Sequence, residues 1–204
     1  MRFVTYRTTH HAAARLGLLV ATDIIDLNRA SAVSEMQLPH EIIPFLTLGE
    51  PAMNEARLIH ESALRDAAAF ADARMPVGMV ELLAPVPRPS SMRDGYAFRQ
   101  HVEAARRNRG VEMIPEFDLF PVFYFTNHQA VIGPGPMSVM PDHLNKLDFE
   151  LEAAIVIGKE GRNIKASEAD EYIAGYTIMN DWSARHLQME EMKLSLGPAK
   201  GKDF

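Results

Sequence analysis

The chain has 204 residues, enough for one ordinary domain or for one domain with a small appendage. Hydrophobic residues make up 47% and charged residues 24% of the sequence, which is typical of a water-soluble globular protein. The net charge of −6 argues against a nucleic-acid partner, and the absence of cysteine excludes disulfides, zinc–thiolate sites and a thiol nucleophile.

The amino-terminal region gives no sign of a signal peptide or a membrane helix. Its longest apolar run, residues 16–21, is far shorter than the roughly 20 residues that cross a bilayer. The one basic cluster, Arg106, Arg107 and Arg109, is too short to follow a phosphate backbone. The sequence therefore predicts a cytoplasmic protein with neither a membrane nor a nucleic-acid partner.

Residues 1–75 are predicted to form a small N-terminal α/β domain. The expected strands and the best helix cover residues 2–8, 14–21, 24–27 and 54–74. Asn54 is the candidate N-cap of the helix, and Leu58, Ile59 and Leu64 are expected to face the core.

A proline-dense connector follows this region. Three prolines within residues 85–89 exclude a central strand or a helix interior there. We place a domain boundary near residue 75, so that a strand over residues 77–83 leads a second domain of residues 76–204.

The second domain alternates strands with short helices, which predicts a β-rich α+β fold. Helices are expected over residues 94–109 and 183–192, and a short one is expected to start at Ser167. The expected strands cover residues 120–126, 130–132, 147–158 and 176–179.

Three acidic residues stand at the edges of the predicted core. Glu150 and Glu152 point to the same face of their strand because side chains alternate, and residues 153–157 behind them are predicted to be buried. Asp181 follows the next strand. Burying like charges about 7 Å apart without a partner costs several kcal/mol, and a hard divalent cation removes that cost. The alternative is an ordinary solvated strand face.

Asp94 and His101 form a second group, on the predicted helix 94–109. Histidine has a pKa near ~6.5, so it is the side chain best suited to take a proton from water near neutral pH. A histidine on a helix is also common as a solvated or packed residue.

Several blocks of the sequence carry a resemblance to a known family. Leu-Asp-Phe-Glu-Leu-Glu at 147–152 is followed by Tyr-Ile-Ala-Gly-Tyr-Thr-Ile-Met-Asn-Asp-Trp-Ser-Ala-Arg at 172–185. Arg93-Asp94, Arg99-Gln100-His101 and Pro-Val-Phe-Tyr at 121–124 precede them. In this order the blocks resemble the fumarylacetoacetate hydrolase family, in its longer bacterial members, over nearly all of the chain.

The resemblance implies a fold, a cofactor and an activity. The fold would be a mixed β-sheet roll or barrel with a small N-terminal α/β domain. The cofactor would be a divalent cation, Mg²⁺ or Ca²⁺ with Mn²⁺ as a further choice. The activity would be metal-dependent hydrolysis of a carbon–carbon bond in a 1,3-diketo acid, and the family's habit suggests a homodimer.

The resemblance also assigns roles to particular residues. The metal ligands would be Asp94, Glu150, Glu152 and Asp181. His101 would activate water, and Tyr124, Arg185 and Gln188 would hold the substrate. Lys202 would polarise the substrate carbonyl, with Lys200 as the alternative. Arg185 and the lysine would offset the negative charge that four carboxylates leave around one divalent ion.

The sequence departs from the family pattern in one respect, and two alternative functions remain open. Family members continue beyond the position of Phe204 with further strands, so we expect these residues to be part of a longer polypeptide. The same metal site would also suit a 2-oxo acid decarboxylase, isomerase or hydratase, and a metal-binding scaffold without turnover is the third hypothesis.

Overall fold

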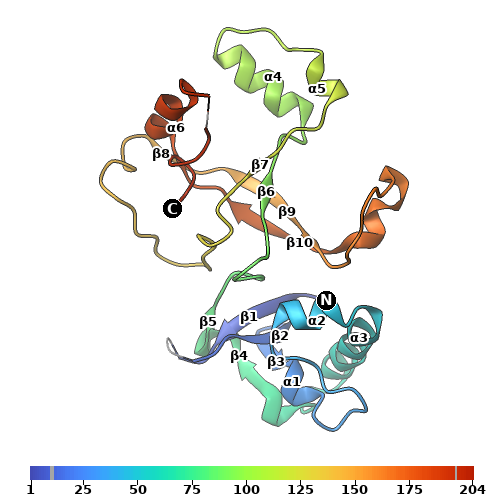
Figure 1. Ribbon diagram of the computed structural model, residues 1–204. Coiled ribbons are helices and arrows are strands. Elements are labelled where there is room, and N and C mark those ends of the chain that lie inside the picture. Colours follow the sequence, from blue (N-terminus) through green and yellow to red (C-terminus); the bar gives the residue numbers. More distant parts are fainter. Residues whose placement is uncertain (10–11, 196) are drawn as a thin grey trace. The chain divides into compact units, whose positions relative to one another are not determined.

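The computed structural model describes residues 1–9, 12–195 and 197–204, and the chain divides into two compact units (Figure 1). The first unit comprises Met1–Arg88, Val131–Met137 and Glu150–Asp181. The second comprises Pro89–Ala130, Ser138–Phe149 and Trp182–Phe204. The division into residues 1–75 and 76–204 stays a prediction.

The first unit contains a five-stranded antiparallel sheet. Its strands are β1 (Phe3–Arg7), β2 (Arg15–Val20), β3 (Asp23–Asp26), β4 (Arg74–Pro76) and β5 (Glu81–Leu82), in the spatial order β4-β3-β2-β1-β5. The strand predictions for residues 2–8 and 14–21 are confirmed to within a residue at each end. The predicted strand over 77–83 is wrong in its first half, where Val77–Met79 form the 3₁₀ helix η2.

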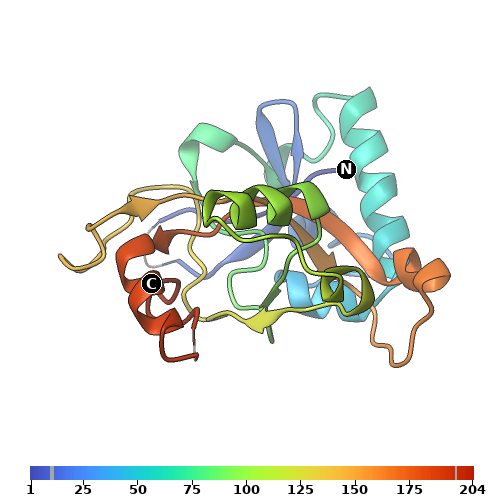
Figure 2. The same ribbon diagram turned by 90° about the horizontal axis from the view of Figure 1, so that it is seen from above.

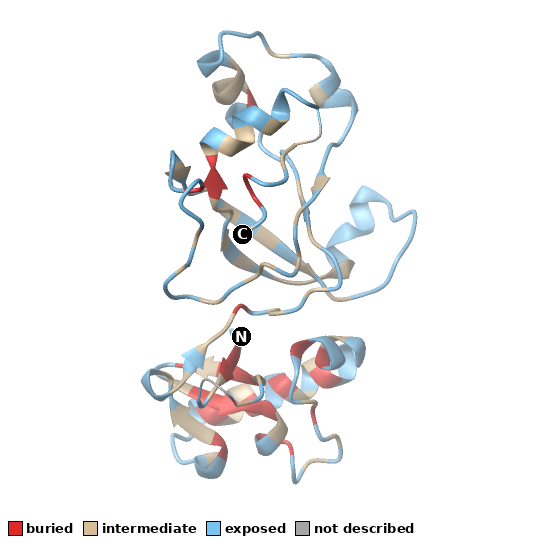
Figure 3. Cartoon of the chain, turned by 60° about the vertical axis from the view of Figure 1, so that its left-hand side comes forward, coloured by how far each residue is buried: buried red, intermediate tan, exposed pale blue. Residues whose placement is uncertain are grey.

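Three α-helices and a 3₁₀ turn accompany this sheet: α1 (Leu27–Ala30), α2 (Ile42–Thr47), α3 (Glu50–Arg65) and η1 (Ala71–Ala73). Helix α3, which is teal in Figure 2, packs against β2. Buried side chains of β2, β3 and α1–α3 form one hydrophobic core, and Figure 3 shows buried residues concentrated in this part of the chain.

Helix α3 differs from the predicted helix over 54–74. It starts earlier because Pro51 fits the first helical turn, and Gly49, not Asn54, is its N-cap. It ends at Arg65, where Asp66 adopts an extended backbone. Ile59 is buried as predicted, but Leu58 and Leu64 are 60% and 62% exposed, because Ala52, Ala56 and Ala63 share the core face with Ile59.

The first unit also contains a hairpin of β9 (Leu151–Ile157) and β10 (Ile173–Asn180), with the 3₁₀ helix η3 (Ala166–Tyr172) before β10. The prediction that residues 153–157 are buried is wrong. Exposure alternates along β9, with Leu151, Ile155 and Ile157 on the exposed face. An apolar run predicts a strand, but it does not show whether other parts of the protein cover both faces of that strand or only one.

The second unit is built from short elements. They are β6 (Arg93–Asp94), β7 (Tyr124–Phe125), β8 (Leu147–Asp148), β11 (Ser183–Ala184), α4 (Arg99–Asn108), α5 (Glu116–Leu119) and α6 (Arg185–Met192). Strand β6 pairs with β7, and β8 pairs with β11. The helix predicted over residues 94–109 begins at Arg99 in the structure. The strand predicted over residues 120–126 is limited to Tyr124–Phe125. Residues 130–132 form no strand. No helix in the described ranges is long and apolar enough to cross a membrane.

A buried carboxylate ties the N-terminal sheet to helix α1. Asp26 is fully buried and accepts hydrogen bonds from the Tyr6 hydroxyl (2.6 Å), the Arg15 guanidinium and the backbone N–H of Arg29 (2.9 Å). Burial alone would raise the pKa of Asp26, but these donors favour the carboxylate, and the net pKa is lowered. Burial, and then the hydrogen bond to Asp26, raise the pKa of Tyr6.

We expect Asp26→Asn to lower the free energy of unfolding at pH 7 by about 3 kcal/mol, because the half-buried Arg15 loses its counter-charge and the buried hydrogen-bond network is broken. Since the folded-state pKa of Asp26 is lowered, its contribution is complete above the unfolded value of about 4 and is lost as the pH falls below it. Urea unfolding between pH 3 and pH 7 measures both effects.

Asp23→Asn is the matched control on the same strand, because the Asp23 carboxylate is more exposed than that of Asp26 and its ion pair with Arg74 should contribute about 0–1 kcal/mol. Equal losses in the two variants would show that the buried network has no special role.

Candidate metal centre and active-site residues

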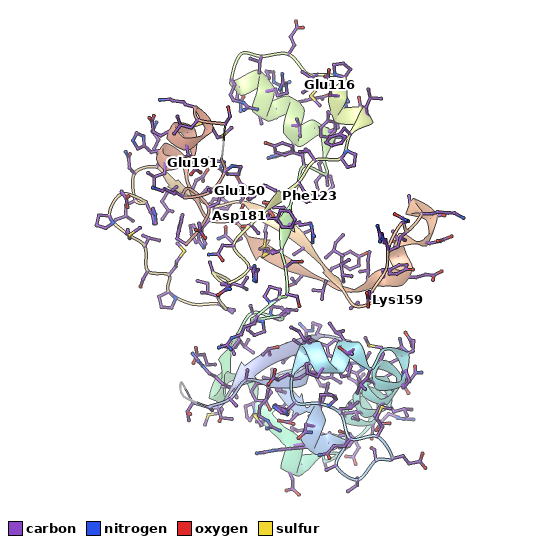
Figure 4. All side chains as sticks on the ribbon, viewed as in Figure 1. Glu116, Phe123, Glu150, Lys159, Asp181 and Glu191 are labelled. Atoms are coloured by element: carbon purple, nitrogen blue, oxygen red, sulfur yellow. The ribbon has the colours of Figure 1, made fainter. Side chains whose placement is uncertain are left out.

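The end of the β9–β10 hairpin carries three of the predicted metal ligands, Glu150, Glu152 and Asp181. The register pairs Glu152 with Met179 and Leu151 with Asn180, so Asp181 falls opposite Glu150. The backbone N–H of Asp181 donates to the carbonyl of Glu150 (3.0 Å), and the N–H of Glu150 donates to Asn180 Oδ1 (3.2 Å). Figure 4 labels Glu150 and Asp181 at this end of the hairpin. The antiparallel register is therefore what gathers the acids.

The carboxylates of Glu152 and Asp181 are placed to share a cation. One oxygen of each lies within 4.8 Å of the other. Two oxygens bound to one Mg²⁺ or Ca²⁺, at roughly 2.1–2.5 Å each, span up to about 4–5 Å. The donor set contains oxygen only, which suits a hard divalent ion. The carboxylate of Glu150 does not belong to this group of described ligand atoms.

Asp94 lies on β6 in the second unit, beside a predicted substrate-binding residue. The β6–β7 register pairs Asp94 with Tyr124, and the Tyr124 hydroxyl donates a 3.0 Å hydrogen bond to Asp94 Oδ2. Gly95 lets the chain pass close to Val122, because a Cβ atom at this glycine would lie 2.5 Å from the Val122 carbonyl oxygen. Tyr124 thus orients the Asp94 carboxylate.

Arg185, at the start of α6, forms side-chain hydrogen bonds with Asp148 and Gln188. Its Nε donates to Asp148 Oδ2 (3.0 Å), and a terminal nitrogen donates to Gln188 Oε1 (3.2 Å). The β8–β11 register, which pairs Asp148 with Ser183, places the acid next to Arg185. Arg185, followed by the backbone N–H of Phe149, holds the pKa of Asp148 below its usual range.

Asp148 is a residue of this site that the sequence reasoning missed. Its spacing could have revealed it, because Asp148, Glu150 and Glu152 alternate along one segment. The predicted substrate-binding pair Arg185 and Gln188 is brought together as expected on one helix face. The guanidinium group of Arg185, however, already forms an ion pair with the Asp148 carboxylate.

The two candidate lysines differ in their surroundings. Lys202 is only 8% exposed, whereas Lys200 is exposed. After Arg185 and the backbone N–H of Phe149, the positive charge of Lys202 also helps to lower the pKa of Asp148. These surroundings favour Lys202 over Lys200 for a role at the site.

His101 lies in the first turn of α4, and its side chain is exposed. Its backbone N–H donates to the Phe98 carbonyl (3.0 Å), which begins the helix. Its role as general base stays a prediction.

Known proteins resemble this chain in sequence. Residues 90–204 match the family model described as fumarylacetoacetate (FAA) hydrolase C-terminal. The mitochondrial oxaloacetate tautomerase FAHD2A of Bos taurus is 33% identical over 192 residues, which are 93% of this chain and 55% of that protein. The chain thus spans about half the length of this curated relative.

Two solved structures show the shared fold. Fumarylacetoacetate hydrolase from Exiguobacterium antarcticum matches all of this chain and 62% of its own, with a TM-score of 0.63 and 22% identity. Maleylpyruvate hydrolase from Sphingobium sp. SYK-6, in complex with manganese(II) and pyruvate, matches 91% of this chain and 60% of its own, with a TM-score of 0.52 and 24% identity.

These matches confirm the predicted fold class, an α+β fold of the fumarylacetoacetase type. The family model covers more than half of the sequence, including the hairpin that carries Glu152 and Asp181. The chain therefore belongs to the fumarylacetoacetate hydrolase family.

Proposed function

We propose that this chain binds one divalent cation and hydrolyses a carbon–carbon bond in a 1,3-diketo acid such as fumarylacetoacetate or an acylpyruvate. The observation that carries the proposal is the pair of carboxylate oxygens from Glu152 and Asp181 within 4.8 Å of each other. Two like charges at this distance repel, a cation between them would offset the repulsion, and oxygen ligands select Mg²⁺, Mn²⁺ or Ca²⁺.

Asp94 and Glu150 are the further proposed ligands. Asp94 is proposed as the third ligand from the family resemblance, and its carboxylate is oriented by the Tyr124 hydroxyl (3.0 Å). Glu150 is supported by its place opposite Asp181 at the end of the hairpin.

A bound divalent cation would supply Lewis-acid polarisation of a substrate oxygen. The remaining work falls to the chain itself. His101 would take a proton from the attacking water, whose oxygen bonds to one carbonyl carbon of the substrate. The carbon–carbon bond then breaks, and its electron pair delocalises onto the second carbonyl of the leaving group. The resulting enolate takes up on carbon the proton that His101 removed from water, so that two acids are released.

Cationic and polar side chains would hold the acidic substrate. Arg185 is suited to a carboxylate because its guanidinium is oriented by Asp148 and Gln188. Lys202 would polarise a carbonyl oxygen, and Tyr124 would contact the substrate from the strand that also orients Asp94.

A second candidate function is isomerisation or decarboxylation of a 2-oxo acid at the same site. The relative that is 33% identical is named an oxaloacetate tautomerase, and this favours the alternative. A tautomerase needs a group that moves a proton between carbon and oxygen, and His101 or Lys202 could hold that proton.

The homodimer and the cytoplasmic location stay predictions. The curated relative is named as a mitochondrial protein, so location is open to a direct test by fractionation.

We expect saturating Mg²⁺, Mn²⁺ or Ca²⁺ to raise the melting temperature of the protein relative to a chelator. At 100 times Kd a ligand of the folded state contributes about 2.7 kcal/mol, or roughly 5–10 °C for a chain of this size. Glu152→Gln and Asp181→Asn should abolish the shift. Asp170→Asn, an exposed acid on η3, is the control that should retain it. A shift that survives in all three variants would place the ion elsewhere.

Substrate choice separates the two candidate functions. We expect fumarylacetoacetate or an acylpyruvate to lose ultraviolet absorbance with metal-loaded protein and to release two acids, detectable by chromatography. If oxaloacetate alone reacts, by tautomerisation or loss of carbon dioxide, the hydrolase proposal is wrong and the second candidate stands.

His101→Ala should keep the metal-dependent melting shift and lose turnover by roughly 10²–10⁴-fold, because general-base catalysis contributes about that factor. His60→Ala, a histidine on α3, is the control. A fully active His101→Ala variant would rule out the general-base assignment.

A further inference from the structure

Glu191 occupies an unusual electrostatic position for a surface acid. It lies in the last turn of α6, where the helix dipole disfavours a negative charge. Its neighbour Glu190 forms an ordinary exposed ion pair with Lys193 (2.6 Å). Glu191 instead turns its carboxylate toward the segment that follows the helix, residues 197–202.

The Glu191 carboxylate accepts hydrogen bonds from three successive backbone N–H groups. Oε1 accepts from Ala199 (2.6 Å) and Gly201 (3.2 Å), and Oε2 accepts from Lys200 (2.7 Å). Successive N–H groups that converge on one point form an anion-binding concavity, and bonds to a carboxylate are about twice as strong as neutral ones. The side chain thus fixes the backbone conformation of this segment.

The same segment presents Lys202. The Lys202 N–H donates to the Ala199 carbonyl (2.8 Å), and the Gly201 carbonyl accepts from the Ala184 N–H (2.8 Å). Gly201 packs so closely on the backbone of Gln188 that a Cβ atom there would approach Gln188 N to 2.8 Å. The segment is therefore held between β11 and α6, and a shift of its backbone would move the buried lysine.

We propose that Glu191 is a positioning residue, which acts through Lys202 by clamping residues 199–201. This proposal rests on the proposed function, in which Lys202 contacts the substrate. Glu191 itself binds neither cation nor substrate in this scheme. Glu191 affects the reaction only because it determines the position of the Lys202 ammonium group.

Glu191→Gln is the sharpest substitution, because it preserves size but turns one acceptor oxygen into a donor that faces the Lys200 N–H. We expect kcat to fall roughly 10- to 100-fold, as for a catalytic group displaced by about 1 Å. The metal-dependent melting shift should be unchanged. Glu190→Gln removes the same charge one residue earlier and should leave kcat within twofold of the unmodified protein.

A double-mutant cycle with Lys202→Ala distinguishes positioning from general support of the fold. If Glu191 acts through Lys202, Glu191→Gln has no further effect on kcat in the Lys202→Ala background. Full additivity of the two losses would overturn the proposal, and so would an unchanged kcat in the single variant Glu191→Gln.

Amide hydrogen exchange tests the clamp without any activity. In Glu191→Gln the amides of residues 199–201 should exchange at least tenfold faster than in Glu190→Gln, with the β9–β10 hairpin unaffected. If exchange responds but no oxo acid is turned over by the unmodified protein, the proposed function fails and the clamp stands. Unchanged exchange would refute the clamp itself.

Discussion

Repulsion between neighbouring carboxylates is the constraint on which the proposed centre depends. The β9–β10 register fixes Glu150 opposite Asp181 and puts oxygens of Glu152 and Asp181 within 4.8 Å. The backbone hydrogen bonds of the hairpin set this geometry, whether or not an ion is present. A site organised in this way can bind a cation without rearranging its strands, which limits the entropy cost of binding.

The second unit places positive and polar groups by a different principle. Here, side-chain hydrogen bonds hold the short elements. Asp148 binds Arg185, Tyr124 binds Asp94, and Glu191 binds the backbone before Lys202. The first two interactions restrict the rotation of a proposed functional side chain, and the third fixes the backbone that carries one. Strand pairs of two residues contribute little rigidity alone, so these hydrogen bonds carry much of the local order.

The sequence predicted what depends on local pattern and failed where tertiary contacts decide. The β1 and β2 strands and the acids at the end of β9 follow from alternation and position. The predicted helix over residues 54–74 differs from α3 because the prediction followed an apolar pattern that runs on to residue 74. Gly49 and Pro51, which set the true start of the helix, carry no apolar periodicity. The exposure of Ile155 could not be predicted, because the apolar run does not show that one face of β9 is left uncovered. Glu191 gave no signal, since its partners are backbone amides eight to ten residues away.

The metal centre can be observed most directly by anomalous X-ray diffraction from crystals of the protein soaked in Mn²⁺. The account predicts one manganese peak bonded to an oxygen of Glu152 and an oxygen of Asp181. Fully occupied manganese elsewhere, with these two carboxylates in contact with solvent or protein alone, would contradict it.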